Sequence, residues 1–398
     1  MSQVAQVKDA VSIVEIINER VALTPSGNYH RGLCPFHGEK SPSFFVDERI
    51  GHFRCFGCGE SGDVLAFLEK YDSLTFREAL EYLADRAGIT LTKHVASSQD
   101  LLRARSLEAL AAAAEFYQQN LGNSSLGQQA KNYLKNRQVS SNTIKYFGLG
   151  VATAGWQDLA DHLQKKGFTR QEMVAAGLVI EKKTGGIFDR FRMRLMFPLK
   201  NHRGQVVGFS GRLLAEKEGE AKYINSPETA LYHKGKMLYG LSENAQEIKK
   251  KNAMIIVEGE FDMISSYQAH VENVVAIKGS ALTSDHAQII ARYTNLVYLA
   301  LDGDEAGVKA THKAVSVLRE VGVELKVVMS PGGQDPDDFA RQDPGGWRKA
   351  VAKAVSAYEY FLIVTSKKYD LSTTTATLEN KKTALKELAP LFATIDSL

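Results

Sequence analysis

Short apolar runs and helical stretches alternate along the second half of the chain. The apolar runs are rich in β-branched residues and cover 253–257, 296–301 and 325–329. Stretches with helical periodicity follow at 261–269, 284–293 and 305–321. Strands that alternate with helices predict a parallel sheet covered by helices. The pattern therefore predicts an α/β domain in this half of the chain.

Acidic residues follow each of the three predicted strands. Glu258 follows the first, and pairs follow the other two, Asp302 with Asp304 and Asp335 with Asp337. In open parallel sheets the functional crevice lies outside the carboxyl ends of the strands, so we expect these carboxylates to meet at one edge. Mg²⁺ would offset their repulsion and suits phosphoryl transfer. Any one of these acids alone is more typical of a turn, but three groups in register favour a metal site.

A Glu-Gly pair followed by two Asp-x-Asp groups on a βα repeat resembles the Toprim domain of primases, topoisomerases and related nucleases. The motifs that carry the resemblance are Val257-Glu258-Gly-Glu-Phe-Asp262, Asp302-Gly-Asp304-Glu-Ala-Gly307 and Gln334-Asp335-Pro-Asp337-Asp338.

All three cysteines of the chain lie in one short segment near the N-terminus. Cys34 is followed at the third position by His37, and Cys55 likewise by Cys58, with seventeen residues between the two pairs. This spacing predicts tetrahedral Zn²⁺ bound by three thiolates and one imidazole, in a filled site that is structural rather than catalytic. His30 and His52 are alternatives for the fourth ligand, and the x₂ spacing favours His37. Chance clustering of small buried cysteines is the competing explanation.

The segments around the predicted zinc site form a small α+β pattern. We expect an amphipathic helix over 4–21, strands over 43–46 and 52–55, and helices over 62–71, capped by Ser61, and 75–87, capped by Ser73 or Thr75. Cations and aromatic residues are interleaved in this region: Lys40, Arg49, Arg54, Phe36, Phe44, Phe45, Phe53 and Phe56. Such a mixture suits single-stranded nucleic acid, although most of the rings are expected to pack the small core.

A linker and a mixed α+β region follow. Residues 90–106 break the pattern and are expected to form a flexible linker, followed by a helix over 107–121 and a turn into a strand over 142–151.

Arginines alternate with apolar residues over 189–198. A strand there would place Arg190, Arg192 and Arg194 on one face. A phosphate backbone and ordinary solvent are equally acceptable partners for such a face. Turn-rich segments further on carry three more cations, a weak signal for nucleotide phosphates: Arg212, Lys222 and Lys234.

Composition leaves the class of partner open. The 398 residues are 44% hydrophobic and 24% charged with a net charge of +3, which is ordinary for a soluble chain of two or three domains. Any surface for nucleic acid must therefore be local. Three cysteines in so long a chain exclude a disulfide framework. No run approaches the length of a membrane span and no signal segment is evident, so we expect a cytoplasmic protein without membrane contact.

The order of these features resembles the bacterial DnaG-type primases over nearly the whole chain. Further motifs that carry the resemblance are Arg190-Phe-Arg-Met-Arg194 with Phe197-Pro198, Phe209-Ser-Gly-Arg212, Lys222-Tyr-Ile-Asn-Ser-Pro227 and His233-Lys234-Gly235. The resemblance implies a DNA-dependent RNA polymerase that joins ribonucleoside triphosphates into short RNA primers on single-stranded DNA under Mg²⁺ or Mn²⁺, at the replication fork.

The resemblance also implies roles for individual residues. Glu258 would carry the catalytic acid role, with Asp302 and Asp304 holding metal and Asp335 and Asp337 supporting or sharing it. The candidates for template or nucleotide contact are Arg190, Arg192, Arg194 and Arg212, and those for nucleotide phosphates are Lys222 and Lys234. The zinc region would bind template.

The expected division is a zinc-binding domain over 1–92, a linker over 93–106, a basic subdomain over 107–245, a Toprim domain over 246–338 and a helical subdomain over 339–398. Family members usually continue into a helical domain that binds the replicative helicase. Either that coupling is absent or the chain is a fragment that lacks the domain, and the abrupt end of the last predicted helix favours a fragment. We expect a monomer.

Two residues depart from the family pattern. Lys278 stands where an apolar residue is commoner, and Glu305 adds negative charge beside the expected metals. The alternatives to a primase are a Toprim-type nuclease and a non-catalytic single-stranded-DNA-binding zinc protein whose acids hold a structural cation.

Overall fold

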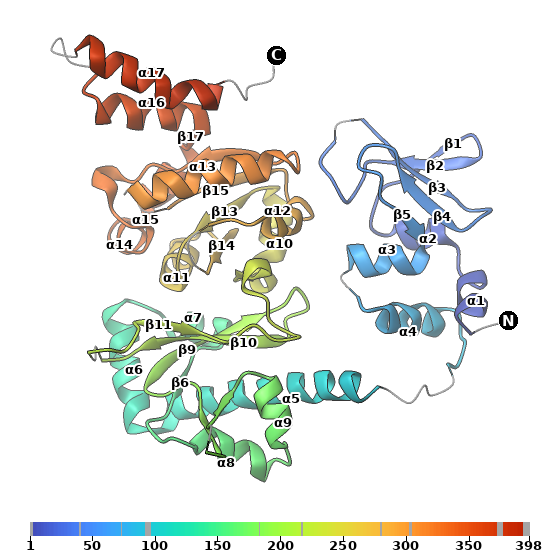
Figure 1. The fold of residues 1–398 in the computed structure, drawn as a ribbon, viewed down its shortest axis with the longest axis horizontal. Coiled ribbons are helices and arrows are strands. Elements are labelled where there is room, and N and C mark those ends of the chain that lie inside the picture. The colour runs from blue at the N-terminus through green and yellow to red at the C-terminus, as the bar shows by residue number, and fades with distance from the viewer. Residues whose placement is uncertain are drawn as a thin grey trace. The chain divides into compact units, whose positions relative to one another are not determined.

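The computed structural model describes residues 3–39, 41–72, 74–91, 97–182, 184–215, 218–278, 281–301, 305–371 and 377–392. Its contacts divide the chain into two compact units (Figure 1). The first comprises Met1–Leu101, Ala287–Asn295 and Glu320–Val323, and the second Leu102–His286, Leu296–Arg319 and Glu324–Leu398. Within the described ranges, no helix is both long and apolar enough to cross a membrane.

The N-terminal part is a five-stranded antiparallel sheet with short helices, strands β1 to β5 lying in chain order. Its elements are α1 (Gln3–Asp9), α2 (Ile13–Asn18), β1 (Thr24–Ser26), β2 (Tyr29–Gly32), β3 (Phe44–Asp47), β4 (His52–Cys55), β5 (Ser61–Asp63), α3 (Val64–Tyr71) and α4 (Phe76–Arg86). Phe44, Phe53 and Phe67 are fully buried between sheet and helices. The expected packing role is therefore confirmed for Phe44 and Phe53.

Local capping decides where the N-terminal helices begin. The expected single helix over 4–21 is wrong, because the Ser12 side chain accepts a hydrogen bond from the amide of Glu15 and starts a second helix there. The expected cap of α3 by Ser61 is also wrong: Ser61 lies in β5, and Asp63 accepts from the amide of Ala66 at 2.9 Å. The cap of α4 by Thr75 is confirmed, in a reciprocal arrangement with Glu78.

Helix α5 (Ser98–Asn123) replaces most of the expected linker. Residues 98–106 continue the helix predicted from 107 onward, so an irregular linker over the whole of 93–106 is wrong; residues 92–96 lie outside the described residues. Ser97 explains the early start, because its hydroxyl accepts from the amide of Asp100 at 3.1 Å and its own amide donates to the Asp100 carboxylate at 3.3 Å.

The middle region is an antiparallel four-stranded sheet in the order β11-β10-β9-β6, with helices packed against it. Its elements after α5 are α6 (Ser125–Asn136), α7 (Ser141–Phe147), β6 (Gly150–Ala152), α8 (Asp158–Lys165), α9 (Arg170–Ala175), β7 (Val179–Glu181), β8 (Ile187–Asp189), β9 (Arg194–Lys200), β10 (Val206–Leu213) and β11 (Tyr223–Asn225). Helix α5 lies along this sheet (Figure 1), and Tyr117 meets Phe209 edge to face at 5.2 Å. The turn expected within 142–151 is instead helix α7, which ends at the left-handed Gly148, and the strand expected after it is β6.

A six-stranded sheet in the order β12-β14-β13-β15-β16-β17 forms the core of the remaining part of the second unit. The strands β14, β13, β15 and β16 are parallel and the two edge strands antiparallel. The predicted parallel α/β domain is confirmed, and β14 is a strand that the apolar pattern did not single out.

The elements of this part run from residue 234 to residue 392. They are η1 (Lys234–Lys236), β12 (Leu238–Tyr239), α10 (Leu241–Lys251), β13 (Met254–Val257), α11 (Glu260–Gln268), β14 (Val274–Ile277), α12 (Ser284–Ala291), β15 (Leu296–Leu299), α13 (Glu305–Arg319), β16 (Glu324–Val327), η2 (Pro331–Gly333), α14 (Pro336–Gln342), α15 (Pro344–Ala352), β17 (Val355–Ser356), α16 (Ala357–Lys368) and α17 (Leu378–Phe392). Helices α16 and α17 pair at the C-terminal end (Figure 1).

Candidate functional site

The three cysteines and His37 come together beside the sheet of the first unit. One ligand atom from each of Cys34, His37, Cys55 and Cys58 lies within 4.8 Å of the others. Cys34 Sγ is 3.8 Å from Cys58 Sγ, and Cys55 Sγ is 3.7 Å from His37 Nδ1. A tetrahedron with zinc–sulfur bonds of about 2.3 Å needs ligand atoms roughly this far apart. Among the described residues this group includes His37 and neither His30 nor His52.

Backbone and side-chain groups around the cluster suit thiolates. The amides of Gly57 and Cys58 point at Cys55 Sγ, at 3.3 and 3.4 Å. The other ring nitrogen of His37, Nε2, lies 3.4 Å from a carboxylate oxygen of Glu39, as is usual for a metal-binding histidine. Burial raises the pKa of the Cys34 thiol, so a cation is needed to keep it as a thiolate. The donor set and its surroundings fit zinc.

Glu258 and Asp335 follow strands of the parallel sheet. Glu258 comes directly after β13, whose Ile256 lies opposite Leu299 of the neighbouring strand β15. The parallel register brings the chain after both strands to one edge, as expected. Asp302 and Asp304, which follow β15, lie outside the described residues. Asp335 lies beyond β16 and caps α14, accepting from the amide of Asp338 at 2.7 Å.

Asp337 lies near Asp335 but is already engaged. Ligand oxygens of Asp335, Asp337 and Asp338 lie within 4.8 Å of one another. The Asp337 side chain, only 5% exposed, forms an ion pair with Arg137 and accepts a hydrogen bond from the hydroxyl of Ser265. Arg341 Nε lies 3.4 Å from its Oδ1. The metal role of Asp337 stays a prediction, and these contacts favour a structural role.

The three arginines over 190–194 do not share a face of a strand. Strand β9 begins only at Arg194, and Met193 adopts a left-handed conformation with φ +52°. The expected strand over 189–198 is therefore confirmed only from Arg194 onward, because the conformation of Met193 interrupts the alternation of side chains. Arg192 stacks on the ring of Trp156 at 3.5 Å and donates to the carbonyl of Ala154 at 2.8 Å.

The two other arginines of this motif also contact backbone carbonyls. Arg194 is buried and donates from Nη1 to the carbonyls of Gly211 and Ala221, at 3.2 and 3.0 Å. Arg190 is half-buried and donates to the carbonyl of Asn225 at 3.4 Å. Burial lowers the pKa of both guanidiniums. Their local contacts favour a role in folding this region.

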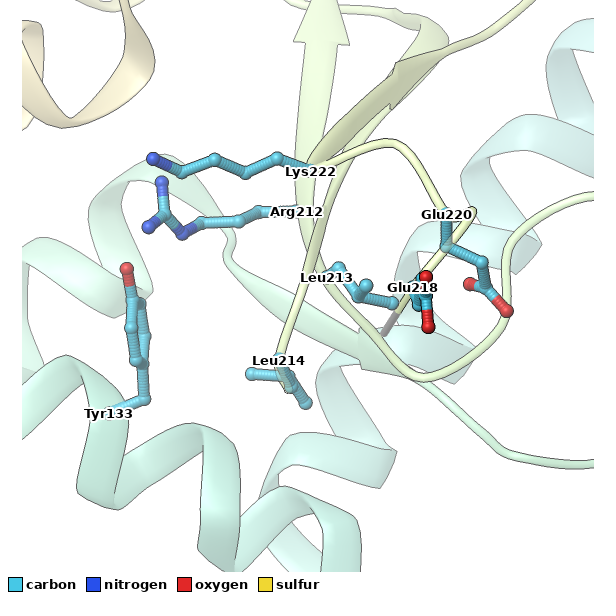
Figure 2. A pocket seen from close by; sticks show the side chains of 7 residues that line it. All are labelled: Tyr133, Arg212, Leu213, Leu214, Glu218, Glu220 and Lys222. Carbon is cyan, nitrogen blue, oxygen red and sulfur yellow. The ribbon is translucent and has the colours of Figure 1, made fainter. Parts of the chain in front are cut away.

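Arg212 and Lys222 line a pocket of about 450 Å³ between the β10–β11 strands and α6. Its lining residues are Tyr133, Arg212, Leu213, Leu214, Glu218, Glu220 and Lys222. Figure 2 shows Arg212 and Lys222 extending side by side, with the hydroxyl of Tyr133 pointing toward Arg212. Within the described residues neither cation forms an ion pair with a carboxylate. Lys234 lies separately, exposed on the η1 turn.

Aromatic rings and Arg137 complete this basic site. Arg212 donates to the hydroxyl of Tyr223 at 2.7 Å and lies 5.4 Å from the ring centre of Phe261, while Arg137 lies 4.6 Å from the same ring. Tyr133 and Arg137 were not singled out from the sequence. They lie at the end of an ordinary amphipathic helix, and no local pattern distinguishes them from solvent-facing residues.

Three family models match consecutive parts of the chain. They describe a CHC2 zinc finger over residues 1–99, the N-terminal domain of a DNA primase catalytic core over 116–245, and a Toprim-like domain over 255–340. With the cysteine cluster, the first match indicates a structural zinc site.

Proteins named as DNA primases are similar to the same chain over most of its length. A DNA primase of Clostridium acetobutylicum is 40% identical over 90% of this chain and 59% of its own length. The solved zinc-binding and RNA polymerase domains of the Aquifex aeolicus primase are 31% identical, with a TM-score of 0.63, over 98% of this chain and 92% of that one. A DnaG primase catalytic domain solved with single-stranded DNA is also 31% identical, with a TM-score of 0.62, over 73% of this chain and 93% of that one.

A zinc ribbon joined to a DNA primase catalytic core and a Toprim-like sheet defines a class of multidomain proteins. Within that class, the chain belongs to the DnaG-type primase family. The chain spans a little under 60% of the length of the Clostridium relative.

Proposed function

We propose that this chain is a DNA-dependent RNA polymerase that synthesises short RNA primers on single-stranded DNA. The observation that carries the proposal is the edge of the parallel sheet, where Glu258 and Asp335 follow β13 and β16 on the two sides of the strand that leads to Asp302. Family membership supports the same reaction. We also propose the domain division at 92, 245 and 338, with α5 spanning the expected boundary at 106.

Glu258, Asp302, Asp304 and Asp335 are the proposed ligands of Mg²⁺ or Mn²⁺. Bound metal would orient the nucleotide phosphates and stabilise the charge that develops during transfer. Asp335 is suited to this role because it is exposed at the sheet edge. The hydrogen bond that caps α14 uses only one of its two carboxylate oxygens, Oδ1. Asp337 would hold its neighbours in place rather than contact metal.

Arg212 and Lys222 are the proposed partners of the triphosphate. Two cations without a carboxylate partner in the described structure would gain most from a multiply charged anion. Tyr133 also lines the pocket, with its ring centre 5.3 Å from the guanidinium of Arg212. Lys234, on its exposed turn, is proposed as a further phosphate contact.

The zinc ribbon presents a surface suited to the template. Arg31, Phe45 and Arg54 are cross-strand neighbours on β2, β3 and β4, so their side chains share one face of the sheet. Phe56, 67% exposed, meets Phe45 at 5.4 Å and carries the guanidinium of Arg54 at 5.3 Å. Exposed rings among arginines suit stacking of bases and attraction of phosphates. We propose that single-stranded DNA lies along this face; Lys40 lies outside the described residues.

Primer synthesis by the zinc-loaded chain tests the proposal. With a single-stranded template, ribonucleotides and Mg²⁺ or Mn²⁺, we expect RNA products in a gel assay. Asp302→Ala should reduce synthesis by about 100-fold or more and leave template binding largely intact. Glu379→Gln, an exposed change on α17, is the matched control.

Two other results would contradict a primase. Cleaved DNA without RNA product would identify a nuclease. A protein whose only activity is DNA binding, unaffected by Asp302→Ala, would identify a binding module with a structural cation.

A further inference from the structure

A buried ion pair lies at the same sheet edge as Glu258. Lys278 pairs with Glu260, and their side chains are only 4% and 5% exposed. Lys278 is the first residue after β14, and Glu260 is the first residue of α11. Because β14 and β13 are parallel, with Ala276 opposite Val257, the residues that follow both strands emerge together.

Stability alone does not account for this pair. Two apolar side chains of similar volume usually serve as well as a buried ion pair, or better, whereas removal of one partner leaves a buried charge. Burial and, secondarily, the ammonium of Lys234 lower the pKa of Lys278. The Glu260 carboxylate beside it favours the charged form. Burial of these two charges costs free energy, so we expect the position of the pair in the fold to explain why it is present.

The pair lies one residue away from the proposed catalytic carboxylate. Only Gly259 separates Glu258 from Glu260, and its amide donates to the Asp262 carboxylate at 2.8 Å within the first turn of α11. The backbone of Glu258 is therefore fixed by β13 on one side and by the start of α11 on the other. The Glu260–Lys278 contact ties that start to the end of β14.

The turn that carries Lys234 is attached close by. Thr283 Oγ1 donates to the carbonyl of Gly235 at 2.6 Å, and His286 Nε2 lies 3.1 Å from the carbonyl of Met237. Leu238 of β12, two residues beyond η1, lies opposite Ile277, the last residue of β14. The end of β14 therefore lies between a proposed metal ligand and a proposed phosphate contact.

We propose that Lys278 is a positioning residue, which through its ion pair with Glu260 joins the end of β14 to the start of α11 and thereby fixes Glu258 relative to Lys234. This inference rests on the proposed polymerase function. Lys278 itself would contact neither metal nor nucleotide.

Four forms of the zinc-loaded full chain test the inference: wild type, Lys278→Met, Glu260→Leu/Lys278→Met, and Glu260→Asp/Lys278→Arg. The apolar double variant removes both charges and should melt within about 4 °C of wild type, since a small change in free energy shifts Tm by only a few degrees. Its kcat for primer synthesis should nevertheless fall about 10- to 100-fold, the effect of a misplaced reacting group, with KM for ribonucleotide nearly unchanged. The Asp/Arg variant keeps the pair and should keep kcat within about threefold.

Each outcome has a definite meaning. An apolar double variant with the Tm and kcat of wild type would overturn the inference, because the pair would then be dispensable. If that variant fails to fold, the Asp/Arg variant decides: folded and active supports positioning by the charge pair, and folded but as inactive as Lys278→Met overturns it. A wild-type protein that makes no RNA would contradict the proposed function itself, and is recognised before any variant is compared.

Discussion

Arg137 at the end of α6 and Asp337 on α14 form an ion pair across two hundred residues of sequence. The carboxylate is buried, and it also accepts from Ser265 on α11. The guanidinium lies over Phe261 next to Arg212, so the contact links the proposed nucleotide pocket to the helices of the Toprim sheet. Asp337 thus joins two parts of the second unit.

Asp337→Asn should destabilise the second unit by about 2–4 kcal/mol, because Arg137 loses its charged partner and Arg341 keeps only Asp338. Arg137→Met should cost at least as much, because it leaves the Asp337 carboxylate, whose side chain is only 5% exposed, without this partner. The double variant should be more stable than the sum of the two losses predicts, by about 1 kcal/mol or more. Urea unfolding of all four proteins measures this coupling. Strictly additive losses would show that the two side chains do not interact in solution.

Cys55→Ser should release zinc and unfold the sheet of the first unit, because a structural zinc site supplies much of the folding free energy of so small a region. The second unit should keep its structure. Zinc content and limited proteolysis measure the two effects. His52→Ala and His30→Ala are the matched controls and should retain zinc, while His37→Ala should lose it. Zinc retained in His37→Ala but lost in His52→Ala would reassign the fourth ligand.

Neutralisation of the pocket should change the salt dependence of nucleic-acid binding if Arg212 and Lys222 contact backbone phosphates of the template or primer in addition to the nucleotide. For Arg212→Gln/Lys222→Gln, the slope of log K against log salt should fall by about 1–2. Fluorescence anisotropy with a primer–template duplex measures the slope. Lys250→Gln is the matched control: this side chain on α10 is 73% exposed, and its loss should leave the slope unchanged. Arg194→Gln should instead lower Tm, since its buried guanidinium donates to the carbonyls of Gly211 and Ala221. An unchanged slope in the pocket variant would remove these two cations from the binding surface.

Asp189 should make the stability of the second unit depend on mild acidity. Burial raises its pKa to about 6, helped by Asp158 and Asp161 and opposed by the amides of Leu159 and Ala160, which donate to it. The folded state therefore holds this proton more tightly than the unfolded chain, whose aspartate pKa is about 3.9. The protonated Asp189 carboxyl group therefore stabilises the folded state below about pH 4. This stabilisation is lost as the pH rises to about 6.

Comparison of Asp189→Asn with wild type isolates that contribution. The variant should lack this part of the decline in unfolding free energy between about pH 4 and pH 6, whereas Asp285→Asn, an exposed change, should retain it. Parallel pH profiles for the wild type and Asp189→Asn would contradict the raised pKa.

Much of the fold follows from local patterns, because these patterns act over a few residues. The apolar runs before Glu258 and Asp335 predicted strands that the structure contains, and their parallel register follows from the helices between them. The two cysteine motifs predicted a cluster that the structure assembles with His37. Thr75 predicted the start of α4. Each of these signals is carried by a few neighbouring residues of the chain.

The tertiary structure alone decided which partners the charged side chains have. The Arg190–Arg194 motif suggested one basic face. Because Met193 is left-handed, the three arginines do not share a face and instead contact carbonyls of other segments. Asp337 resembles its neighbour Asp335 in sequence, yet it pairs with an arginine two hundred residues away. Lys278 departs from the family pattern in sequence, and the structure places Glu260 beside it as its charged partner. The sequence by itself determined where strands end and where metal-binding residue types stand. The three-dimensional fold decided which of those charges are paired and buried, because electrostatic partners depend on distance in space and not along the chain.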